Sequence, residues 1–308
     1  MANRVFVTGG SGFVGSEIID ELRARGWSVN ALVRRHDLSG YDSEVHSVKG
    51  SLFDATTLDA GLADCEAIIQ LVGIIKEDRA RNITFDRIHY QGTKNLVDAA
   101  RRVSVKRFLH MSALGVRADA QSEYHRSKFK AEEYLRASGL DWTIIQPSLI
   151  HGPGGEFMQM EAKWARKQSP PFFAMPYFGA GCLGLSGAGL LQPVYVKDVA
   201  RAFVDAMENS RTIQQTYPLG GPDRLTWPEL HQAVAMAVVG HRRWVLPFPV
   251  PIAKFYAAIG FGKLLGFNRD QIIMSQEDNT CDLTKFKTDF GWDPQPFVPT
   301  LHRYAKQL

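Results

Sequence analysis

The chain has 308 residues, of which 45% are hydrophobic and 22% are charged, and its formal net charge is +4. Such a composition is typical of a globular protein with a substantial core, and so slight a positive charge argues against nucleic-acid binding. The three cysteines, Cys65, Cys182 and Cys281, lie far apart and form neither a disulfide framework nor a zinc-ligand cluster. We therefore expect no metal and a reducing compartment, the cytoplasm.

The first predicted strand, 5–7, runs into a glycine-rich turn and then into a helical pattern from Ser16. Gly9, Gly12 and Gly15 occupy the turn, where glycines allow a tight bend and bring backbone N–H groups to a pyrophosphate at the helix N-terminus. Glycines at this spacing between a strand and a helix are strong evidence for a dinucleotide site.

The second predicted strand, 29–33, is followed directly by Arg34 and Arg35. A carboxylate at this point binds the ribose 2′-hydroxyl of NAD, whereas arginine accommodates the 2′-phosphate of NADP. Asp37, the first acid, comes late. The sequence therefore favours NADP(H), and NAD(H) remains the alternative. After the third strand, Leu52 lies in a loop that would pass the adenine ring.

Further strand patterns alternate with helical ones, which predicts an α/β Rossmann fold with a doubly wound parallel sheet. The predicted strands are 45–48, 67–72, 107–111 and 142–146, and the predicted helices include 85–102 and 123–137. After Pro147 the composition changes. We expect residues 1–147, joined by 190–222, to form an NAD(P)-binding domain, and 148–189 with 223–308 to form a smaller C-terminal substrate or partner lobe. The role of the glycine-rich segment 178–189 stays open.

A tyrosine and a lysine four residues apart, Tyr124 and Lys128, lie on one face of the predicted helix 123–137. Beside a cofactor ribose the lysine charge would lower the pKa of the phenol, so that Tyr124 could exchange a proton near neutral pH. Ser112, at the end of the strand before this helix, would bind the substrate oxygen. Tyr90 and Lys94 repeat the spacing, but no strand end with a serine precedes them. We therefore predict Ser112, Tyr124 and Lys128 as catalytic residues.

The most apolar stretch, 245–267, contains three prolines and two lysines. From Ile252 onward it could form an amphipathic helix lying on a membrane or a partner, or a core helix of the second lobe. His151 is a secondary acid or base candidate.

The glycine turn, Ser112 and the Tyr124–Lys128 pair together resemble the extended and atypical short-chain dehydrogenase/reductase superfamily. A closer resemblance is to bacterial relatives of the NAD(P)H-binding accessory subunit of respiratory complex I, described as NAD-dependent epimerase/dehydratase-like proteins. The segments that carry it are HMSALG (110–115), YHRSK (124–128), QPSLIHGPG (146–154) and LQPVYVKDVA (191–200).

This resemblance implies a Rossmann fold with bound NADP(H), a cofactor that is structural in the complex I subunit. It also implies a set of cofactor-binding residues: Thr8, Gly9, Gly12, Phe13, Val14, Gly15, Arg34, Arg35, Leu52, Val72, Lys128, Pro147 and Ser148. The chain departs from the pattern at Ser51, where relatives carry an acid, and at Gln70 and Val72, where they carry histidine and alanine.

Two functions remain open from the sequence. One is an oxidoreductase or epimerase/dehydratase acting on a small carbonyl or alcohol substrate. The other is a non-catalytic NAD(P)H-binding accessory subunit or assembly factor of respiratory complex I, peripheral on the inner membrane, with 245–267 contacting the complex or the membrane surface.

Overall fold

The computed structural model describes residues 3–34, 38, 40–181, 184, 189–258, 267 and 269–308. The chain forms two compact units. The first comprises Met1–Pro147, Val196–Leu219 and Leu283–Trp292, and the second comprises Ser148–Tyr195, Gly220–Asp282 and Asp293–Leu308. Residues 283–292, which the sequence pattern assigned to the smaller lobe, lie in the first unit of this division, and 190–195 and 220–222, which it assigned to the NAD(P)-binding domain, lie in the second.

The first unit contains a seven-stranded parallel sheet in the order β10-β6-β5-β4-β1-β2-β3. Its strands are β1 (Arg4–Thr8), β2 (Ser28–Val33), β3 (Val45–Lys49), β4 (Ala67–Gln70), β5 (Arg107–Met111), β6 (Asp141–Pro147) and β10 (Gln215–Leu219). The strand order reverses between β1 and β4, the point at which ligands bind in open α/β sheets. The predicted Rossmann fold is confirmed.

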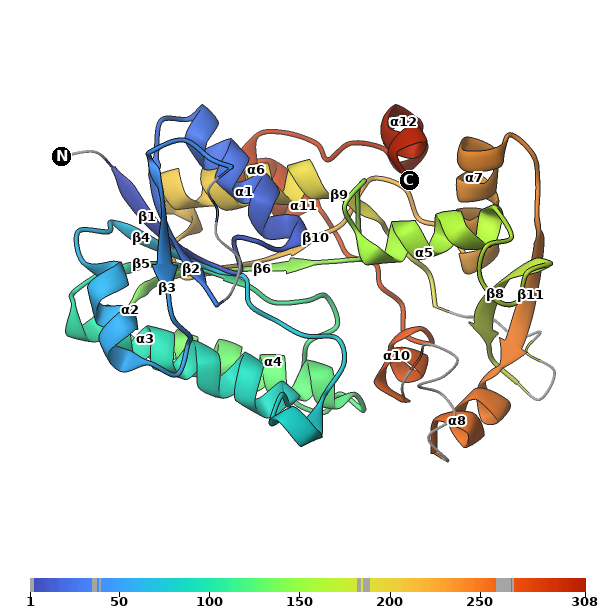
Figure 1. The fold of residues 1–308 in the computed structure, drawn as a ribbon, viewed down its shortest axis with the longest axis horizontal. Coiled ribbons are helices and arrows are strands. Elements are labelled where there is room, and N and C mark those ends of the chain that lie inside the picture. The colour runs from blue at the N-terminus through green and yellow to red at the C-terminus, as the bar shows by residue number, and fades with distance from the viewer. Residues whose placement is uncertain are drawn as a thin grey trace. The chain divides into compact units, whose positions relative to one another are not determined.

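Helices cover both faces of this sheet, as Figure 1 shows. On one face lie α2 (Ala55–Leu62), α3 (Gly92–Arg102) and α4 (Glu123–Arg136), and on the other lie α1 (Phe13–Ala24), α6 (Val196–Glu208) and α11 (Thr284–Phe290). Because both faces are covered, every residue of β2 is buried. A π-helical turn, Asp86–Gln91, precedes α3 in the stretch predicted as one helix.

Two of these elements end or begin for local reasons. β4 stops at Gln70, two residues before the predicted end. The Leu71 N–H is shared between the carbonyl and the hydroxyl of Thr8 (3.3 Å each), and the Val72 N–H donates to the side chain of Gln70 (Oε1, 3.3 Å) instead of to β1. α4 begins after Ser122, whose hydroxyl accepts the His125 N–H.

The second unit packs short strands and helices around small apolar clusters. It contains β7 (Ile150–His151) paired with β9 (Val194–Tyr195), β8 (Ala174–Gly179) paired in parallel with β11 (Trp244–Pro249), and the helices α5 (Glu156–Ala165), α7 (Trp227–Val239), α8 (Val250–Ala258), α10 (Arg269–Met274) and α12 (Phe297–Tyr304). A capping box between Thr226 and Glu229 starts α7.

The apolar stretch 245–267 forms most of β11 and then α8, which buries Val250 and Ala253 and exposes Ile252 and Phe255. Residues 259–266 and 268 lie outside the described part. Within the described residues, no helix is both long and apolar enough to cross a bilayer.

Candidate functional site

The glycine turn after β1 has the geometry that a pyrophosphate requires. Gly9 has a φ of +76°, which favours glycine, and its carbonyl accepts the Gly12 N–H at 3.0 Å. A Cβ on Gly15 would lie 2.1 Å from the Gly9 carbonyl oxygen, so only glycine lets the helix approach the turn this closely.

The N-terminus of α1 is open to an anion. Gly12 is the N-cap and no side chain caps the helix, so the first N–H groups at Phe13 and Val14 are not satisfied by a capping side chain. With the helix dipole they form a site for phosphate. These residues therefore fit a dinucleotide pyrophosphate.

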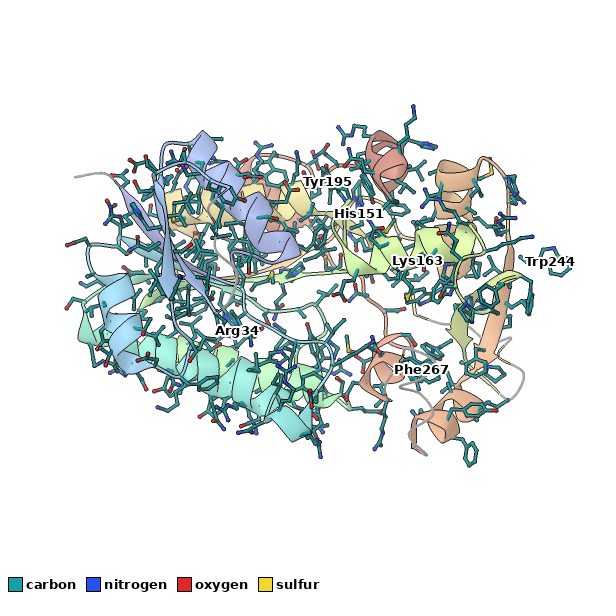
Figure 2. All side chains as sticks on the ribbon, in the orientation of Figure 1. Arg34, His151, Lys163, Tyr195, Trp244 and Phe267 are labelled. Carbon is teal, nitrogen blue, oxygen red and sulfur yellow. The ribbon has the colours of Figure 1, made fainter. Side chains whose placement is uncertain are left out.

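Arg34 directly follows β2 and is exposed. Figure 2 labels it on the first unit. Arg35, its predicted companion at the 2′-phosphate, lies outside the described residues. The structure thus places one of the two arginines, with an exposed side chain, at the carboxyl end of β2.

The ends of β1 and β4 are tied together by buried polar side chains. Thr8 Oγ1 donates to Gln70 Oε1, and the amide of Gln70 donates to Thr93 Oγ1 at 3.4 Å. Val72, predicted to contact the cofactor, follows Gln70 and is half-buried. The hydroxyl of Thr8 is thus occupied in joining strands, and Thr8 would contribute to the turn through its backbone.

The remaining predicted cofactor residues lie in different surroundings. Leu52 is 5% exposed and belongs to the apolar cluster between the sheet and α2 and α3. Pro147 ends β6 in the first unit, and its carbonyl accepts the Leu114 N–H at 3.0 Å. Ser148 belongs to the second unit, where its hydroxyl donates to the Gln192 carbonyl.

Ser112 follows β5 with its side chain buried. Its N–H donates to the Ile145 carbonyl at 2.9 Å, which fixes its backbone against β6. Its Oγ is buried and has no hydrogen-bond partner among the described residues. Because a buried hydroxyl without a partner is costly, this atom is suited to bind an oxygen supplied by a ligand.

Tyr124 lies at the start of α4 in an aromatic environment. Its ring meets those of Phe85, His89 and His125 edge-on, at centroid distances of 5.8, 5.2 and 5.3 Å. Burial raises the pKa of the phenol above its usual value. Burial is the cause that acts on Tyr124 in this structure, whereas the lowering that we attributed to Lys128 refers to the site with a cofactor ribose in place and stays a prediction.

Lys128 lies one turn further along the same helix face and is 4% exposed. Its Nζ donates to the Met111 carbonyl at 3.1 Å and lies 5.5 Å from the centroid of the Tyr124 ring. Burial lowers the pKa of Lys128 to about 8, against the opposing attraction of Glu132. The structure thus brings the predicted tyrosine and lysine together.

The other tyrosine and lysine at this spacing do not form such a site. Lys94 is half-exposed and pairs with Asp98 at 2.7 Å. Its Nζ contacts the ring of Tyr134 rather than that of Tyr90.

Two buried histidines beside Lys128 were missed from the sequence. His110 points from β5, and burial together with the Lys128 and Arg136 charges lowers its pKa to about 3. His89 comes from the π-helical turn, and burial, with the Lys128 charge, holds its pKa well below the usual value. Both rings are therefore neutral at physiological pH. No spacing in the sequence joins them to Lys128, since they come from three different elements.

His89 is held by hydrogen bonds at both ring nitrogens. Nδ1 lies 2.8 Å from Ser127 Oγ, which itself donates to the Tyr124 carbonyl at 2.8 Å. Nε2 lies 3.0 Å from the Ile74 nitrogen and 3.1 Å from the Ile74 carbonyl oxygen, so it can accept from the first or donate to the second. The neutral ring thereby links the segment after β4 to α4, beneath Tyr124.

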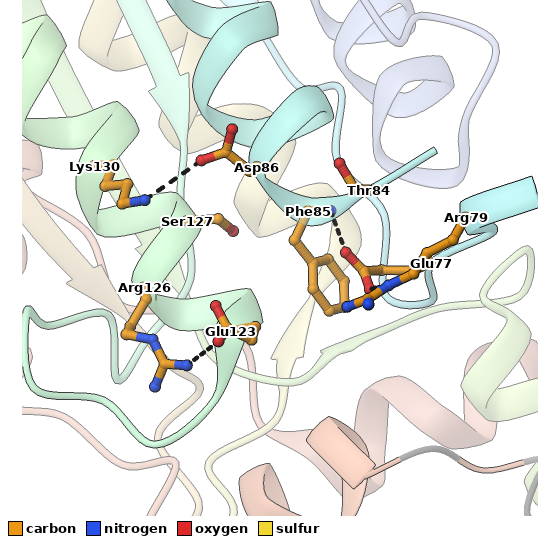
Figure 3. Close-up of a pocket in the computed structure, with 9 residues that line it drawn as sticks. All are labelled: Glu77, Arg79, Thr84, Phe85, Asp86, Glu123, Arg126, Ser127 and Lys130. Carbon is orange, nitrogen blue, oxygen red and sulfur yellow. Dashed lines mark hydrogen bonds and ion pairs between the residues drawn. The ribbon is translucent and has the colours of Figure 1, made fainter. Parts of the chain in front are cut away.

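A pocket of about 480 Å³ opens between the π-helical turn and α4, and Figure 3 shows its lining. Its charged groups are largely paired: Lys130 with Asp86 at 3.4 Å and Arg126 with Glu123. Ser127 and Phe85 link this pocket to the residues around Lys128, since Ser127 Oγ lies 2.8 Å from His89 Nδ1 and the Phe85 ring contacts those of His89 and Tyr124. None of the predicted catalytic residues lines it.

His151 belongs to the second unit. It is fully buried, its Nδ1 lies 2.9 Å from the Tyr304 hydroxyl, and burial lowers its pKa to about 3. A structural role in β7 follows from these contacts. Among the residues that the structure describes, no cluster of histidine, cysteine or carboxylate side chains could hold a metal ion.

Comparison with known families gives one match over half of the chain. The sequence profile of the NAD(P)H-binding family matches residues 9–163, from the glycine turn through α4 and into α5.

Two characterised relatives differ in what they do. The mitochondrial NADH dehydrogenase (ubiquinone) 1 alpha subcomplex subunit 9 of Arabidopsis thaliana is 30% identical over 261 residues, which cover 82% of this chain and 62% of that protein. The chain thus spans less than two thirds of that relative. A ceramide reductase of Caulobacter vibrioides is 34% identical over 153 residues, covering 49% of this chain and 47% of the reductase.

Solved structures share the fold. An enzyme of Bordetella bronchiseptica in complex with NAD⁺ superposes with a TM-score of 0.76 at 21% identity, and UDP-glucose 4-epimerase of Thermotoga maritima with a TM-score of 0.74 at 19% identity. Each comparison covers 99% of this chain and 98% of the other. At this identity they establish the fold alone.

Proposed function

The chain belongs to the NAD(P)H-binding family, and from this premise we propose that it is an NADP(H)-dependent oxidoreductase or epimerase/dehydratase acting on a carbonyl or an alcohol. The observation that carries the proposal is the buried Ser112 hydroxyl without a partner among the described residues, at the strand end that precedes the Tyr124–Lys128 helix. The division into a cofactor domain and a substrate lobe is part of the same proposal.

The chemistry assigns one role to each of the three side chains. A bound nicotinamide would supply or take up the hydride. Ser112 Oγ–H would hydrogen-bond the substrate oxygen. Tyr124 stays a neutral phenol because burial raises its pKa, so it can give its proton to that oxygen during reduction. Lys128, with a pKa of about 8, is still largely charged at neutral pH and would stabilise the phenolate that remains.

The test of this role is Tyr124→Phe, which removes the proton and keeps the ring. We expect the variant to reduce carbonyls about a hundredfold more slowly or worse, since loss of a general acid typically costs this much. NADPH consumption would be measured against a panel of aldehydes, ketones and quinones. Tyr90→Phe, which removes a phenol from the other pair, is the control. An unchanged rate in Tyr124→Phe would overturn the assignment.

The cofactor preference rests on Arg34. We expect Arg34→Ala to weaken NADPH binding by roughly tenfold or more and to leave NADH binding unchanged, since a charge-assisted bond to the 2′-phosphate is lost. Calorimetric titration with both nucleotides measures this, with the exposed Arg101→Ala as control. A wild-type preference for NADH would refute the NADP(H) assignment.

A second candidate, a nucleotide-binding subunit without turnover, is favoured by the relationship to a respiratory-chain subunit over 82% of this chain. In this case the nucleotide would stabilise the fold and hardly exchange, and the protein would associate with a respiratory complex at the membrane. Native mass spectrometry of freshly isolated protein would detect both the bound nucleotide and co-isolated subunits. Tight nucleotide with no consumption across the carbonyl panel would favour this candidate over the first.

A further inference from the structure

We propose that the second unit binds the surface of a lipid bilayer that carries anionic headgroups. The contact surface, which we call the aromatic edge, consists of Phe172, Phe173, Trp244, Leu246, Ile252 and Phe255. The proposal deepens the docking candidate above by naming the surface that would be contacted, and it does not depend on hydride transfer.

The side chains of the aromatic edge are unusually exposed for their size. Trp244 is 72% exposed, Phe255 61%, Phe173 59% and Phe172 57%. Single exposed apolar residues are ordinary, but a run of large aromatic ones marks an interaction surface. These four come from segments that the fold joins: Phe173 directly precedes β8, Trp244 pairs with Ala174 in the β8–β11 ladder, and α8 follows β11.

The local structure fixes which side chains point outward. Along β11 the side chains alternate, so Val245 packs into the cluster of Ala165, Met175 and Ala235 while Trp244 and Leu246 face away from it. Figure 2 shows Trp244 projecting away from the ribbon. These residues are therefore held outward by a packed element rather than by a loop.

Helix α8 continues the edge in the same way. It buries Val250 and Ala253 against Phe178 and Phe248. Ile252 and Phe255, three residues apart, lie on its exposed side. The buried side of α8 thus packs inside the second unit, and the apolar side chains on its other side remain exposed.

Charge along the segments that supply the aromatic edge has one sign. The two stretches of the second unit that contain it, 162–195 and 230–269, have no aspartate or glutamate, whereas they have eight lysines and arginines. Lys163, Lys167, Arg242 and Lys254 are exposed, and none of them forms an ion pair with a described residue. Acidic residues resume only at Asp198 and Asp270. Such a surface is complementary to anions.

Aromatic side chains together with unpaired cations are the combination that an anionic bilayer surface recognises. Tryptophan and phenylalanine enter the boundary between headgroups and acyl chains, and lysine and arginine attract the anionic headgroups. A protein partner would fit the apolar side chains, but it would need acidic groups placed opposite four separate cations. A fluid layer of anionic lipids meets this requirement without a fixed arrangement.

The test is flotation of the full chain with vesicles of phosphatidylcholine alone or of phosphatidylcholine mixed with phosphatidylglycerol. We expect binding to the mixed vesicles, weak binding to phosphatidylcholine, and weakening at high salt. Arg242→Gln with Lys254→Gln should weaken binding about fivefold for each charge removed, roughly 25-fold together. Arg101→Gln with Lys106→Gln, both exposed in the first unit, is the matched control and should bind normally.

The apolar part is tested separately with Trp244→Ser and Phe255→Ser. We expect each substitution to weaken binding at least tenfold, because an exposed aromatic side chain loses its burial in the lipid. Phe53→Ser, an exposed aromatic of the first unit, should leave binding unchanged. Unaltered circular dichroism and nucleotide affinity in all variants show that a loss is not unfolding.

Three results would overturn the proposal: no binding to either kind of vesicle, binding that these variants leave unchanged, or a dimer in sedimentation velocity that the Trp244 and Phe255 substitutions dissociate while vesicles do not bind. The last result would assign the edge to a second copy of the chain. Failure of vesicle binding leaves carbonyl reduction and nucleotide binding untouched, so it is distinguishable from failure of the proposed function.

Discussion

Lys128 is a charged residue in a buried position, where the loss of water disfavours its charge. Its ammonium has one close acceptor, the Met111 carbonyl, and it faces two neutral histidines, while Glu132 lies a turn away and is itself engaged by Arg136 at 2.8 Å and Gln146 at 2.8 Å. A lysine with a pKa of about 8 titrates near physiological pH. Groups with strongly shifted pKa values concentrate at functional sites, where the arrangement that chemistry requires lowers the stability of the fold.

Lys128→Met should therefore stabilise the protein while abolishing carbonyl reduction. The folded pKa of about 8 lies below the reference 10.5, so the unfolded chain binds more protons between these values and wild-type stability rises with pH through this window. At pH 7 we expect a gain of about 2 kcal/mol in the free energy of unfolding. Urea unfolding from pH 7 to 10 measures it, and the rise with pH should disappear.

The control for this prediction is Lys130→Met, which removes an exposed lysine of the same helix and should change stability by less than about 0.5 kcal/mol. Destabilisation of Lys128→Met at pH 7 would show that the bond to the Met111 carbonyl outweighs the burial of the charge.

At the scale of single residues, spacing in the sequence predicted the contacts that depend only on the geometry of one helix. Tyr124 and Lys128 are four apart on a helix, and the structure brings them onto one face as expected. Spacing could not show that the surroundings of Tyr124 are aromatic, because Phe85 and His89 come from another segment. It therefore predicted the effect of Lys128 on the Tyr124 pKa but not the opposing effect of burial.

At the scale of elements, a buried polar pair joins α5 to α7. His231 Nδ1 lies 2.7 Å from Glu161 Oε2, and neither side chain is exposed. Trp164 and Trp227 contact the imidazole ring at centroid distances of 6.3 and 6.0 Å. The pair thus joins two helices that also pack through Ala165 and Ala235 in one apolar cluster.

Glu161→Ala should weaken the second unit strongly, because it leaves His231 buried without its acceptor. Loss of one member of a buried pair typically costs about 3 kcal/mol. Chemical denaturation followed by tryptophan fluorescence measures it, since two tryptophans border the pair. Lys163→Gln, an exposed change on the same helix, should be nearly neutral. A change in Glu161→Ala as small as in this control would mean that the pair is replaceable by water.

Strands and helices were predicted well where their buried residues recur with a regular period in the sequence. The strands β1, β2 and β5 and the helix α4 are apolar in the pattern that their packing requires, and they were found within a residue or two. β10 was missed because it is a short edge strand containing Pro218, which no local signal distinguishes from a loop. The division of 85–102 into a π-helical turn and α3 was likewise invisible in the sequence.

At the scale of the whole molecule, each unit contains a histidine that must stay neutral. His110 in the first and His151 in the second both have pKa values of about 3 because of burial. Between pH 6.5 and 3 the unfolded chain binds more protons than the folded one, so stability falls as the pH falls through this range.

We expect each of these histidines to account for about 2 kcal/mol of lost stability at pH 5 relative to pH 8. His110→Asn and His151→Asn should each reduce the difference in unfolding free energy between the two pH values by this amount, whatever they do to stability itself. Comparison with the wild type cancels the contribution of the carboxylates. His302→Asn, an exposed substitution, should leave the difference unchanged. Equal pH dependence in all four proteins would contradict the prediction.

The chain passes back and forth between the two units, and this determines when each unit can be completed during synthesis. The sheet of the first unit is completed by β10, and α11 then supplies Phe286 to its core and Asp289 to the hydroxyl of Tyr217. Until residue 292 has left the ribosome, β10 and α6 lack the cover that α11 gives them. The nascent chain must therefore hold an incompletely covered sheet through most of its synthesis, a period in which exposed apolar surface favours aggregation.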